Sequence, residues 1–329
     1  MNGRVVAIVV TYAKRHEYVE KVMHEVFHEG VSEVVLVDNA SQLESRAVYD
    51  ELVQSEKRIH LIRNDENLGS SGGFKAGLQY ALSYLRPDFL WLLDDDNVPQ
   101  RGSLKSLVDT WFMIATSHKV DDLALYSYRG ETRAPDKRAV THGHIKRYGK
   151  NNFMGFNFFK AFRRKFIKSA CEAVNYPVVR VTFGPFGGAF FNFNVPRKVG
   201  LPSPEFFVYA DDHEYSLRLN ELGIQQYLVF ASRLKDIDRS FDDDGLLSPN
   251  ASDLKVYYSF RNHTYLSQRF ITNRIFYYFN KFIYITFLLK NLMLLSFKYK
   301  GFAKNRAKLI IKAIVDGESS SLGKVDWLK

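Results

Sequence analysis

Cysteine and long apolar runs are both scarce in this sequence of 329 residues. Cys171 is the only cysteine, so neither an intramolecular disulfide nor a thiolate-rich zinc site can form, which favours a reducing compartment. A membrane span needs about 20 apolar residues, but the best run, residues 282–289, is bounded by Lys281 and Lys290. The apolar run at residues 5–10 is too short for a signal peptide. We therefore expect a cytoplasmic protein that does not cross a membrane.

Several familiar motifs are absent as well. The sequence contains no Walker A loop, no GxGxxG turn and no GxSxG nucleophile turn, which argues against the nucleotide-binding and hydrolase classes that depend on them. Its composition, 46% hydrophobic and 25% charged residues, is that of a globular protein and excludes disorder, collagen and coiled coil.

Positive charge is concentrated in two stretches. Ten Lys and Arg lie between Lys137 and Cys171, and twelve lie between Leu254 and Val315, with no acidic residue in either stretch. Together they exceed the net charge of +10, so the rest of the chain is acidic, which is unusual for a nucleic-acid-binding protein. Seven aromatic residues lie in the first stretch and fifteen in the second. This mixture suits an anionic membrane surface, with a solvated face over an aromatic core as the alternative.

The first hundred residues alternate short apolar runs with amphipathic segments, which is typical of a mostly parallel sheet covered by helices. The apolar runs predict buried strands at residues 5–10, 34–37, 59–62 and 89–93. The segments between them predict helices at residues 17–27, 43–55 and 73–85. Polar residues follow each predicted strand, and open α/β sheets bind ligands at the carboxyl ends of their strands.

The later part of the chain is less regular. We expect a catalytic domain over residues 1–235 with an insertion at about residues 121–178, and a mostly helical, membrane- or acceptor-associated region over residues 236–329. A strand and turn at residues 178–189 and a strand at residues 206–209 complete the predicted domain. A helix from Asp211 to about Gly223 follows, with an apolar stripe on one face.

Three consecutive carboxylates, Asp94, Asp95 and Asp96, follow the predicted strand that contains Trp91. Like charges this close repel one another, and a divalent cation such as Mg²⁺ or Mn²⁺ relieves the repulsion. In an extended segment Asp94 and Asp96 share a face while Asp95 points away. The alternative is a solvated loop that caps the next helix.

The Gly-rich segment NLGSSGGF opens the helix before the acidic strand. Its backbone N–H groups could approach a phosphate or sugar, or it could simply be a turn with a helix cap. The residues concerned are Asn67, Gly69, Gly72 and Gly73.

Asp211 and Asp212 lie at the start of a predicted helix. One interpretation is a pair of acids stabilised by the helix dipole, and the other is a general base that faces the crevice. Periodicity does not choose between them.

Taken in order, six segments resemble the inverting family-2 glycosyltransferases of GT-A fold: VVTY, VDNAS, RNDENLGSSGGF, WLLDDDNVP, FGGAFFN and FFVYADDHEYSLRL. They span about residues 5–222. The GGF turn, the triple Asp and the DD-x-E-Y-x-x-R helix are most similar to the bacterial galactofuranosyl- and rhamnosyltransferases.

The resemblance implies a role for each matching position. Asp212 corresponds to the catalytic base, and Asp94 and Asp96 to the carboxylates that bind the donor diphosphate through Mn²⁺ or Mg²⁺. Asp236 or Asp238 would replace a later histidine that related enzymes use as a further metal ligand. The remaining donor-binding positions are Thr11, Asp38, Asn64, Asn67, Gly69, Gly72, Gly73 and Asp95, and the candidates for a second acid or an acceptor contact are Asp211, Glu214 and Trp91.

The resemblance therefore implies transfer of galactofuranose from UDP-galactofuranose to a hydroxyl of a lipid-linked or polymeric glycan, with no nucleic-acid partner. The enzyme would lie peripherally on the inner face of the cell membrane. The alternatives are a rhamnosyltransferase that uses dTDP-rhamnose, a sugar-nucleotide pyrophosphorylase, whose Gly-rich opening is missing here, and a non-enzymatic membrane adaptor.

Overall fold

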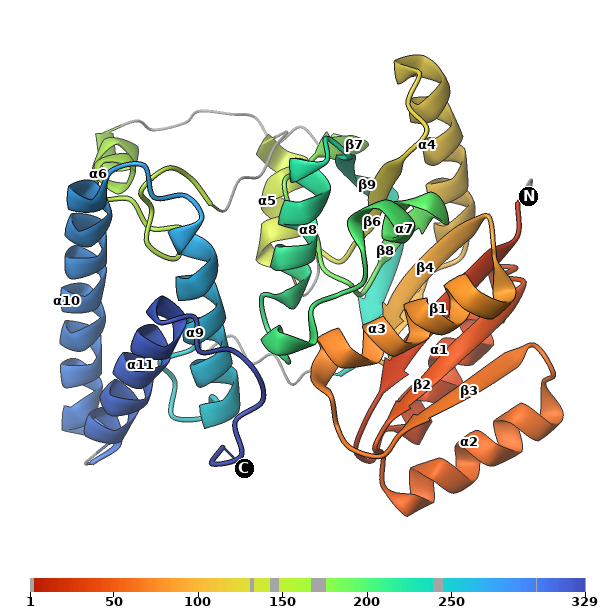
Figure 1. The fold of residues 1–329 in the computed structure, drawn as a ribbon, viewed down its shortest axis with the longest axis horizontal. Coiled ribbons are helices and arrows are strands. Elements are labelled where there is room, and N and C mark those ends of the chain that lie inside the picture. Colours follow the sequence, from red (N-terminus) through yellow and green to blue (C-terminus); the bar gives the residue numbers. More distant parts are fainter. Residues whose placement is uncertain are drawn as a thin grey trace. The chain divides into compact units, whose positions relative to one another are not determined.

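The computed structural model describes residues 3–130, 133–142, 148–166, 176–238, 245–299 and 301–328. Chain contacts divide it into two compact units. The first unit comprises residues 1–145, 173–204 and 211–241, and the second comprises residues 146–172, 205–210 and 242–329 (Figure 1). The boundary near residue 235 that the sequence suggests is therefore displaced, because two earlier segments also belong to the second unit.

The first unit is built on one twisted sheet. Its strands within the described residues are β1 (Val5–Thr11), β2 (Glu33–Asn39), β3 (Ile59–Asn64), β4 (Phe89–Asp94), β5 (Asn97–Pro99), β6 (Leu123–Tyr128), β7 (Val178–Arg180), β8 (Ala189–Asn192) and β9 (Gln225–Asp236). The strand order is β3-β2-β1-β4-β8-β6-β9-β5, with β7 paired to β9. β1 to β4 are mutually parallel, as predicted, whereas β8 is antiparallel to both of its neighbours.

Helices cover both faces of this sheet because alternate residues of each buried strand point to opposite sides. Val6 and Ile8 of β1 pack with Phe74 and Leu78 on one face, while Val9 packs with the helices on the other. The predicted strands and helices of the first hundred residues are confirmed, although β3 is an edge strand and only partly buried. The helices of this unit are α1 (His16–His28), α2 (Leu43–Ser55), α3 (Gly69–Tyr80), the π-helical turn η1 (Ala81–Leu85), α4 (Ser103–His118), α5 (Ala134–His142), α7 (Asn194–Val199) and α8 (Asp211–Glu221).

Two predictions for the later part of the chain are wrong. The expected insertion at residues 121–178 contains β6, which lies within the sheet between β8 and β9. Residues 206–209 do not form a strand: the 3-10 turn η2 (Pro204–Phe206) leads into a loop with positive φ at Phe207, Tyr209 and Ala210. The apolar run FFVY has β propensity, but it forms no strand ladder, and its last three residues, Phe207, Val208 and Tyr209, pack in the core of the helical second unit.

The second unit is helical, as expected for the C-terminal region. It contains α6 (Phe158–Phe166), α9 (Asp253–Gln268), α10 (Arg274–Lys298) and α11 (Phe302–Glu318), which enclose a core of aromatic and aliphatic side chains. α9 and α11 come very close at Gly317, where an added Cβ would lie 2.4 Å from the carbonyl oxygen of Arg261. Among the described helices, none is long and apolar enough to span a membrane.

Candidate active site

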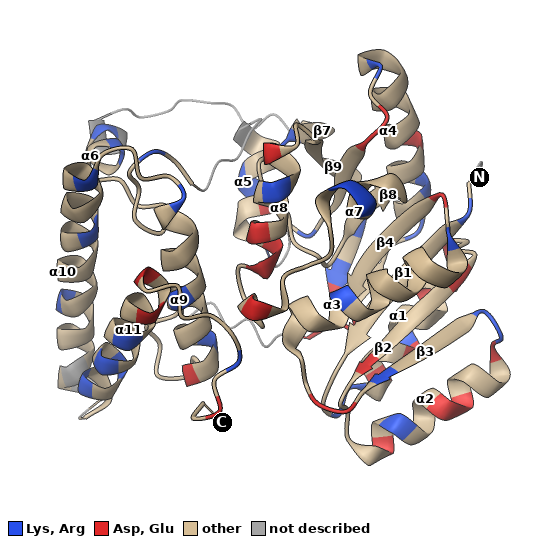
Figure 2. Cartoon of the chain, viewed as in Figure 1, with Lys and Arg blue, Asp and Glu red and all other residues tan. Residues whose placement is uncertain are grey.

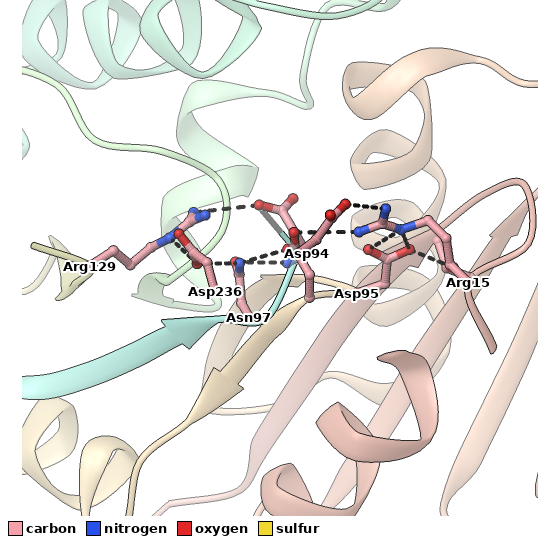
Figure 3. A network of polar contacts seen from close by, with 9 residues as sticks. Arg15, Asp94, Asp95, Asn97, Arg129 and Asp236 are labelled. Carbon is pink, nitrogen blue, oxygen red and sulfur yellow. Dashed lines mark hydrogen bonds and ion pairs between the residues drawn. The ribbon is translucent and has the colours of Figure 1, made fainter. Parts of the chain in front are cut away.

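The three acidic residues at the end of β4 lie near two arginines, and Figure 3 labels Asp94 and Asp95 among them. Asp95 is buried and accepts hydrogen bonds from Thr11 Oγ1 at 2.7 Å and from Arg15 Nε at 2.8 Å. The side chain of Asp94 is 40% exposed, with its carboxylate 3.5 Å from Arg129 Nη1. Asp96 lies 3.4 Å from Arg15 Nη2. The carboxylates are thus divided between two arginines.

Arg15 is the first of these arginines, and the sequence analysis missed it. Its guanidinium contacts Asp95, Asp96 and also Asp238, whose Oδ2 lies 2.6 Å from Nη1. Burial raises the pKa of Asp95 to about 6, although hydrogen bonds from Arg15 and Thr11 act in the opposite direction. The only available signal was a basic residue soon after the first strand, which has no distinctive spacing.

Arg129 is the second arginine and is almost fully buried at the end of β6. Its Nε donates to Asp236 Oδ1 at 2.8 Å, and its Nη1 donates to the Gly187 carbonyl at 3.2 Å. Asn97 donates to both Asp236 and Asp96, at 3.0 and 2.9 Å. This network joins the ends of β6 and β9 to the segment after β4. Arg129 and Asn97 lie 107 and 139 residues before Asp236 in the chain, so the sequence analysis also missed them.

A divalent cation is compatible with this acidic segment. Burial, together with the charges of Asp94 and Asp95, raises the pKa of Asp96 to about 7, and a bound cation would favour the ionised form instead. Among the described residues, no group of three or more His, Cys, Asp or Glu is placed to hold a metal ion. Asp236 and Asp238, the candidates for a third ligand, both pair with arginines. Asp94 and Asp96 also lie near different arginines, Arg129 and Arg15.

The predicted nucleotide-binding residues follow β1, β2 and β3. Asp38 is fully buried, accepts from Ser41 N at 2.7 Å and lies 3.2 Å from Arg46 Nε. Thr11 is also fully buried, and its hydroxyl donates to Asp95. Both side chains are therefore buried and hydrogen-bonded within the protein at the carboxyl ends of β1 and β2.

Asn39, which the sequence analysis did not select, connects the Asn and Gly residues of the predicted donor site. Its Nδ2 donates to Asn67 Oδ1 at 3.1 Å and to the Gly69 carbonyl at 2.9 Å. Its Oδ1 accepts from Asn64 Nδ2 and from Leu68 N, each at 3.0 Å. The structure thus brings Asn64, Asn67 and Gly69 together around one buried amide.

Gly72 and Gly73 allow α3 to pack closely. An added Cβ would lie 2.4 Å from Leu68 Cβ at Gly72 and 2.5 Å from Val10 Cγ1 at Gly73. A side chain at either position would push the start of α3 away from its neighbours. The close packing of α3 therefore accounts for glycine at both positions, independently of any ligand that the nearby N–H groups bind.

Asp211 and Asp212 begin α8 and are held in opposite protonation states. Burial and the charge of Asp212 raise the pKa of Asp211 to about 8, and Ser70 Oγ donates to Asp211 Oδ2 at 2.5 Å. Burial would also raise the pKa of Asp212, but the charge and hydrogen bonds of His213, together with the charge of Arg133, lower it to about 2. Asp212 is therefore ionised at neutral pH, and its charge helps to raise the pKa of Asp94.

Two other candidates have structural surroundings. Glu214 pairs with Arg218 Nε at 2.9 Å, and Arg218 also donates to the Val199 and Leu201 carbonyls. Glu214 thus helps to anchor α8 through Arg218. Trp91 is fully buried in the core under β4, so the prediction that it contacts an acceptor is wrong.

Comparison with known proteins places this geometry in context. The sequence model of glycosyl transferase family 2 matches residues 6–170, half of the chain. No curated protein sequence matches this chain. The structure of S. aureus TarS 1-349 in complex with UDP-GlcNAc has a TM-score of 0.50 at 13% identity and covers 95% of this chain and 81% of that one.

Two further solved structures are similar at lower scores. The mannosyltransferase PcManGT from Pyrobaculum calidifontis, in complex with GDP-Man and Mn²⁺, has a TM-score of 0.49 at 14% identity and covers 97% of this chain and 88% of that one. GalNAc-T7 with UDP, GalNAc and Mn²⁺ also has a TM-score of 0.49 at 14% identity, covering 71% of this chain. This chain spans 43% of the GalNAc-T7 chain and 39% of a longer TarS chain. At these identities the similarity concerns the fold alone.

Removing Arg129 should destabilise the first unit strongly. Arg129→Ala leaves the buried carboxylate of Asp236 without its cation, and breaking a buried pair typically costs about 3–5 kcal/mol. Urea unfolding followed by circular dichroism measures the loss. Arg233→Ala, an exposed arginine on β9, is the control and should cost less than about 1 kcal/mol. Equal losses in the two variants would contradict the assigned network.

Asp211 should make stability decline with rising pH. The raised pKa of Asp211, about 8 in the folded chain against about 4 when unfolded, favours the neutral acid in the folded state. Its stabilising contribution is complete below pH about 4 and is lost as the pH rises to about 8. Thermal unfolding from pH 4 to 8 should show a smaller decline in Asp211→Asn than in the wild type. Glu51→Gln, an exposed acid on α2, should leave the decline unchanged.

Proposed function

The chain belongs to glycosyl transferase family 2 and has a GT-A-like α/β fold, and on this premise we propose that it transfers a sugar from a nucleotide diphosphate to a hydroxyl group with inversion. The observation that carries the proposal is the ionised Asp212 at the start of α8, whose charge acts on Asp94 at the end of β4. A carboxylate that stays ionised and a second one suited to a phosphate-bound cation are the two groups that this reaction needs.

In the proposed mechanism Asp212 accepts the proton of the attacking hydroxyl. The new bond forms between that oxygen and the anomeric carbon, while the bond from this carbon to the diphosphate oxygen breaks on the opposite face, so the configuration inverts. A general base in this role typically contributes ~10² to 10⁴ in rate. A Mn²⁺ or Mg²⁺ ion held by Asp94 and Asp96 would neutralise charge on the departing diphosphate.

The surrounding residues support these roles by position. Arg15 and Thr11 hold Asp95, which orients the segment that carries Asp94 and Asp96. We assign the nucleotide to the carboxyl ends of β1 to β3 and the start of α3, where Asn64, Asn67, Gly69 and Gly73 lie near Asn39, with Asp38 and Gly72 adjacent in the chain to this group.

We propose UDP-galactofuranose as the donor and a lipid-linked or polymeric cell-surface glycan as the acceptor. The support is the sequence resemblance of the GGF turn, the triple Asp and the α8 motif to galactofuranosyl- and rhamnosyltransferases. The same motifs leave dTDP-rhamnose as the alternative donor. A non-enzymatic adaptor would not require an ionised carboxylate beside a metal-competent one.

We further propose that the second unit lies on the anionic inner face of the cell membrane. α10 is apolar on two faces: Tyr277, Leu288 and Leu292 are buried, whereas Ile275 and Phe282 are 80% and 66% exposed. Six of the exposed residues recur at helical spacing and form one stripe, which comprises Ile275, Phe279, Phe282, Leu289, Met293 and Phe297. So large an exposed apolar stripe indicates a partner.

α6 extends the apolar stripe of α10. Phe158 N donates to Asn280 Oδ1 at 2.9 Å, and the Phe158 and Phe279 ring centroids are 5.6 Å apart. Phe159 and Phe162 of α6 are more than half exposed. Lysines and arginines but no acidic residues lie on α6 and α10 (Figure 2), which matches an anionic lipid surface rather than an uncharged partner.

Substitutions at the two aspartates should separate catalysis from donor binding. Asp212→Asn should reduce sugar transfer by ~10² to 10⁴ while UDP binding stays nearly intact, because the base does not hold the nucleotide. Asp94→Ala should remove the part of UDP binding that depends on Mn²⁺. Calorimetry with UDP, dTDP and GDP, each with and without Mn²⁺, measures binding, and release of UDP from UDP-galactofuranose measures activity. Glu51→Gln is the control. Wild-type protein that binds none of the three nucleotides would overturn the proposal and favour the adaptor.

The apolar stripe should determine membrane binding. Flotation with vesicles of neutral lipid, with or without anionic lipid, should show salt-sensitive binding of the wild type only to the anionic vesicles, since each Lys or Arg near such a surface contributes ~1 kcal/mol. Phe282→Ser combined with Met293→Ser should reduce the bound fraction several-fold. The matched control is Leu43→Ser, an 82% exposed leucine on α2, which should bind like the wild type. Absence of wild-type binding to either vesicle type would contradict the membrane assignment.

A further inference from the structure

Two histidines lie one turn apart on the exposed face of α1. His24 and His28 are four residues apart in the chain, and the Nε2 atoms of their imidazoles are 3.2 Å apart. The ring centroids are 4.4 Å apart with an angle of 63° between the ring planes. Both residues are exposed, whereas Val22, Met23 and Val26 of the same helix are buried. This histidine pair is therefore open to ions in solution.

The distance between the two nitrogen atoms matches a tetrahedral zinc ion. Zn–N bonds are about 2.0–2.1 Å long, so two imidazole nitrogens on one tetrahedral ion lie about 3.3 Å apart. Two nitrogens at neighbouring corners of a square-planar Cu²⁺ or Ni²⁺ ion would lie closer together, at about 2.9 Å. A hydrogen bond between the two rings gives a similar separation, and zinc binding is the property that distinguishes the two arrangements.

Glu25 orients the imidazole of His24 for metal binding. Its Oε1 lies 2.9 Å from His24 Nδ1. Because an ionised carboxylate only accepts hydrogen bonds, Nδ1 of the neutral imidazole carries the proton and Nε2 presents its lone pair. Histidines that bind metals typically donate their other ring N–H to a carboxylate or carbonyl, which fixes the tautomer and makes the ligating nitrogen more basic. Glu25 meets this requirement for His24.

The charge of α1 also favours a cation. The helix contains three glutamates and one lysine, which give a net charge of −2 with neutral histidines. The guanidinium of Arg58, whose carbon lies 4.3 Å from the Phe27 ring centroid, is itself paired with Glu56 at 2.6 Å. Imidazole nitrogens suit Zn²⁺, whereas Mg²⁺ and Mn²⁺ prefer carboxylate and phosphate oxygens. The histidine pair therefore differs in its metal preference from the carboxylates at the end of β4.

The histidine pair lies away from the candidate active site along the same helix. α1 begins immediately after Arg15, which contacts Asp95 and Asp96. At a rise of about 1.5 Å per residue, His24 and His28 are about 14 and 20 Å further along the helix axis. A cation bound by the pair would therefore not touch these acidic residues.

We propose that His24 and His28 form a surface zinc site, in which their Nε2 atoms hold one Zn²⁺ ion and water occupies the two remaining positions. The ion links two successive turns of α1. Because the folded helix is what places the two nitrogens together, zinc binding stabilises the folded state. The site is independent of the proposed sugar transfer.

Calorimetry of zinc binding, with protein that carries no histidine tag, tests the site. The wild type should bind one Zn²⁺ ion at the pair, and His24→Ala and His28→Ala should each remove this binding. Glu25→Ala should weaken it about 10-fold, since outer-shell partners typically contribute about 10- to 100-fold in metal affinity. The matched control is His118→Ala, an exposed histidine of α4, which should bind zinc like the wild type. Asp94→Ala should also retain this binding.

Thermal unfolding gives a second measurement on the same proteins. Zinc should raise the unfolding midpoint of the wild type and of His118→Ala, but not that of His24→Ala or His28→Ala, because only a folded pair binds the ion. Zinc affinity that is unchanged in both pair variants, or that is lost in Asp94→Ala instead, would overturn the inference. Absence of saturable zinc binding by the wild type would also overturn it and identify the pair as two hydrogen-bonded rings.

Discussion

Pairing of buried carboxylates with arginine is the interaction on which the candidate site depends. Three acidic residues end β4 in a place where burial and mutual repulsion favour their neutral forms. Arg15, just before α1, and Arg129, just after β6, supply the compensating charge. Because Arg129 also holds Asp236, the ends of three strands are tied together by one buried cation.

Burial and neighbouring charge also shift the pKa values of the two carboxylates at the start of α8. Asp211 and Asp212 are adjacent in the chain, yet Asp211 accepts a hydrogen bond from the Ser70 hydroxyl, whereas Asp212 pairs with the imidazole of His213. Their pKa values move in opposite directions because one receives positive charge and the other receives mainly burial and repulsion. Such a separation lets one acid of a pair stay ionised for proton transfer while its neighbour remains neutral.

The helices of the second unit carry more apolar surface than their shared core buries. α10 buries one apolar stripe against its neighbours and exposes another, while α9 directs a buried Arg and Asn at the loop before α8. A large exposed apolar stripe indicates a surface that a partner covers. Buried polar groups are stable only when they are hydrogen-bonded.

Local chemistry determined much of this protein in advance. The alternating apolar and amphipathic segments predicted β1 to β4 and their helices, because hydrophobic periodicity is a local property. The clusters at Asp94 and Asp211 were also visible as candidates. Only the tertiary structure decided that Trp91 is core, that residues 206–209 form a loop with positive φ and not a strand, and that Arg15 and Arg129 pair with the acidic residues at the end of β4. Each of these depends on partners distant in the chain, and a buried charge or amide acquires its role only from the groups that folding places beside it.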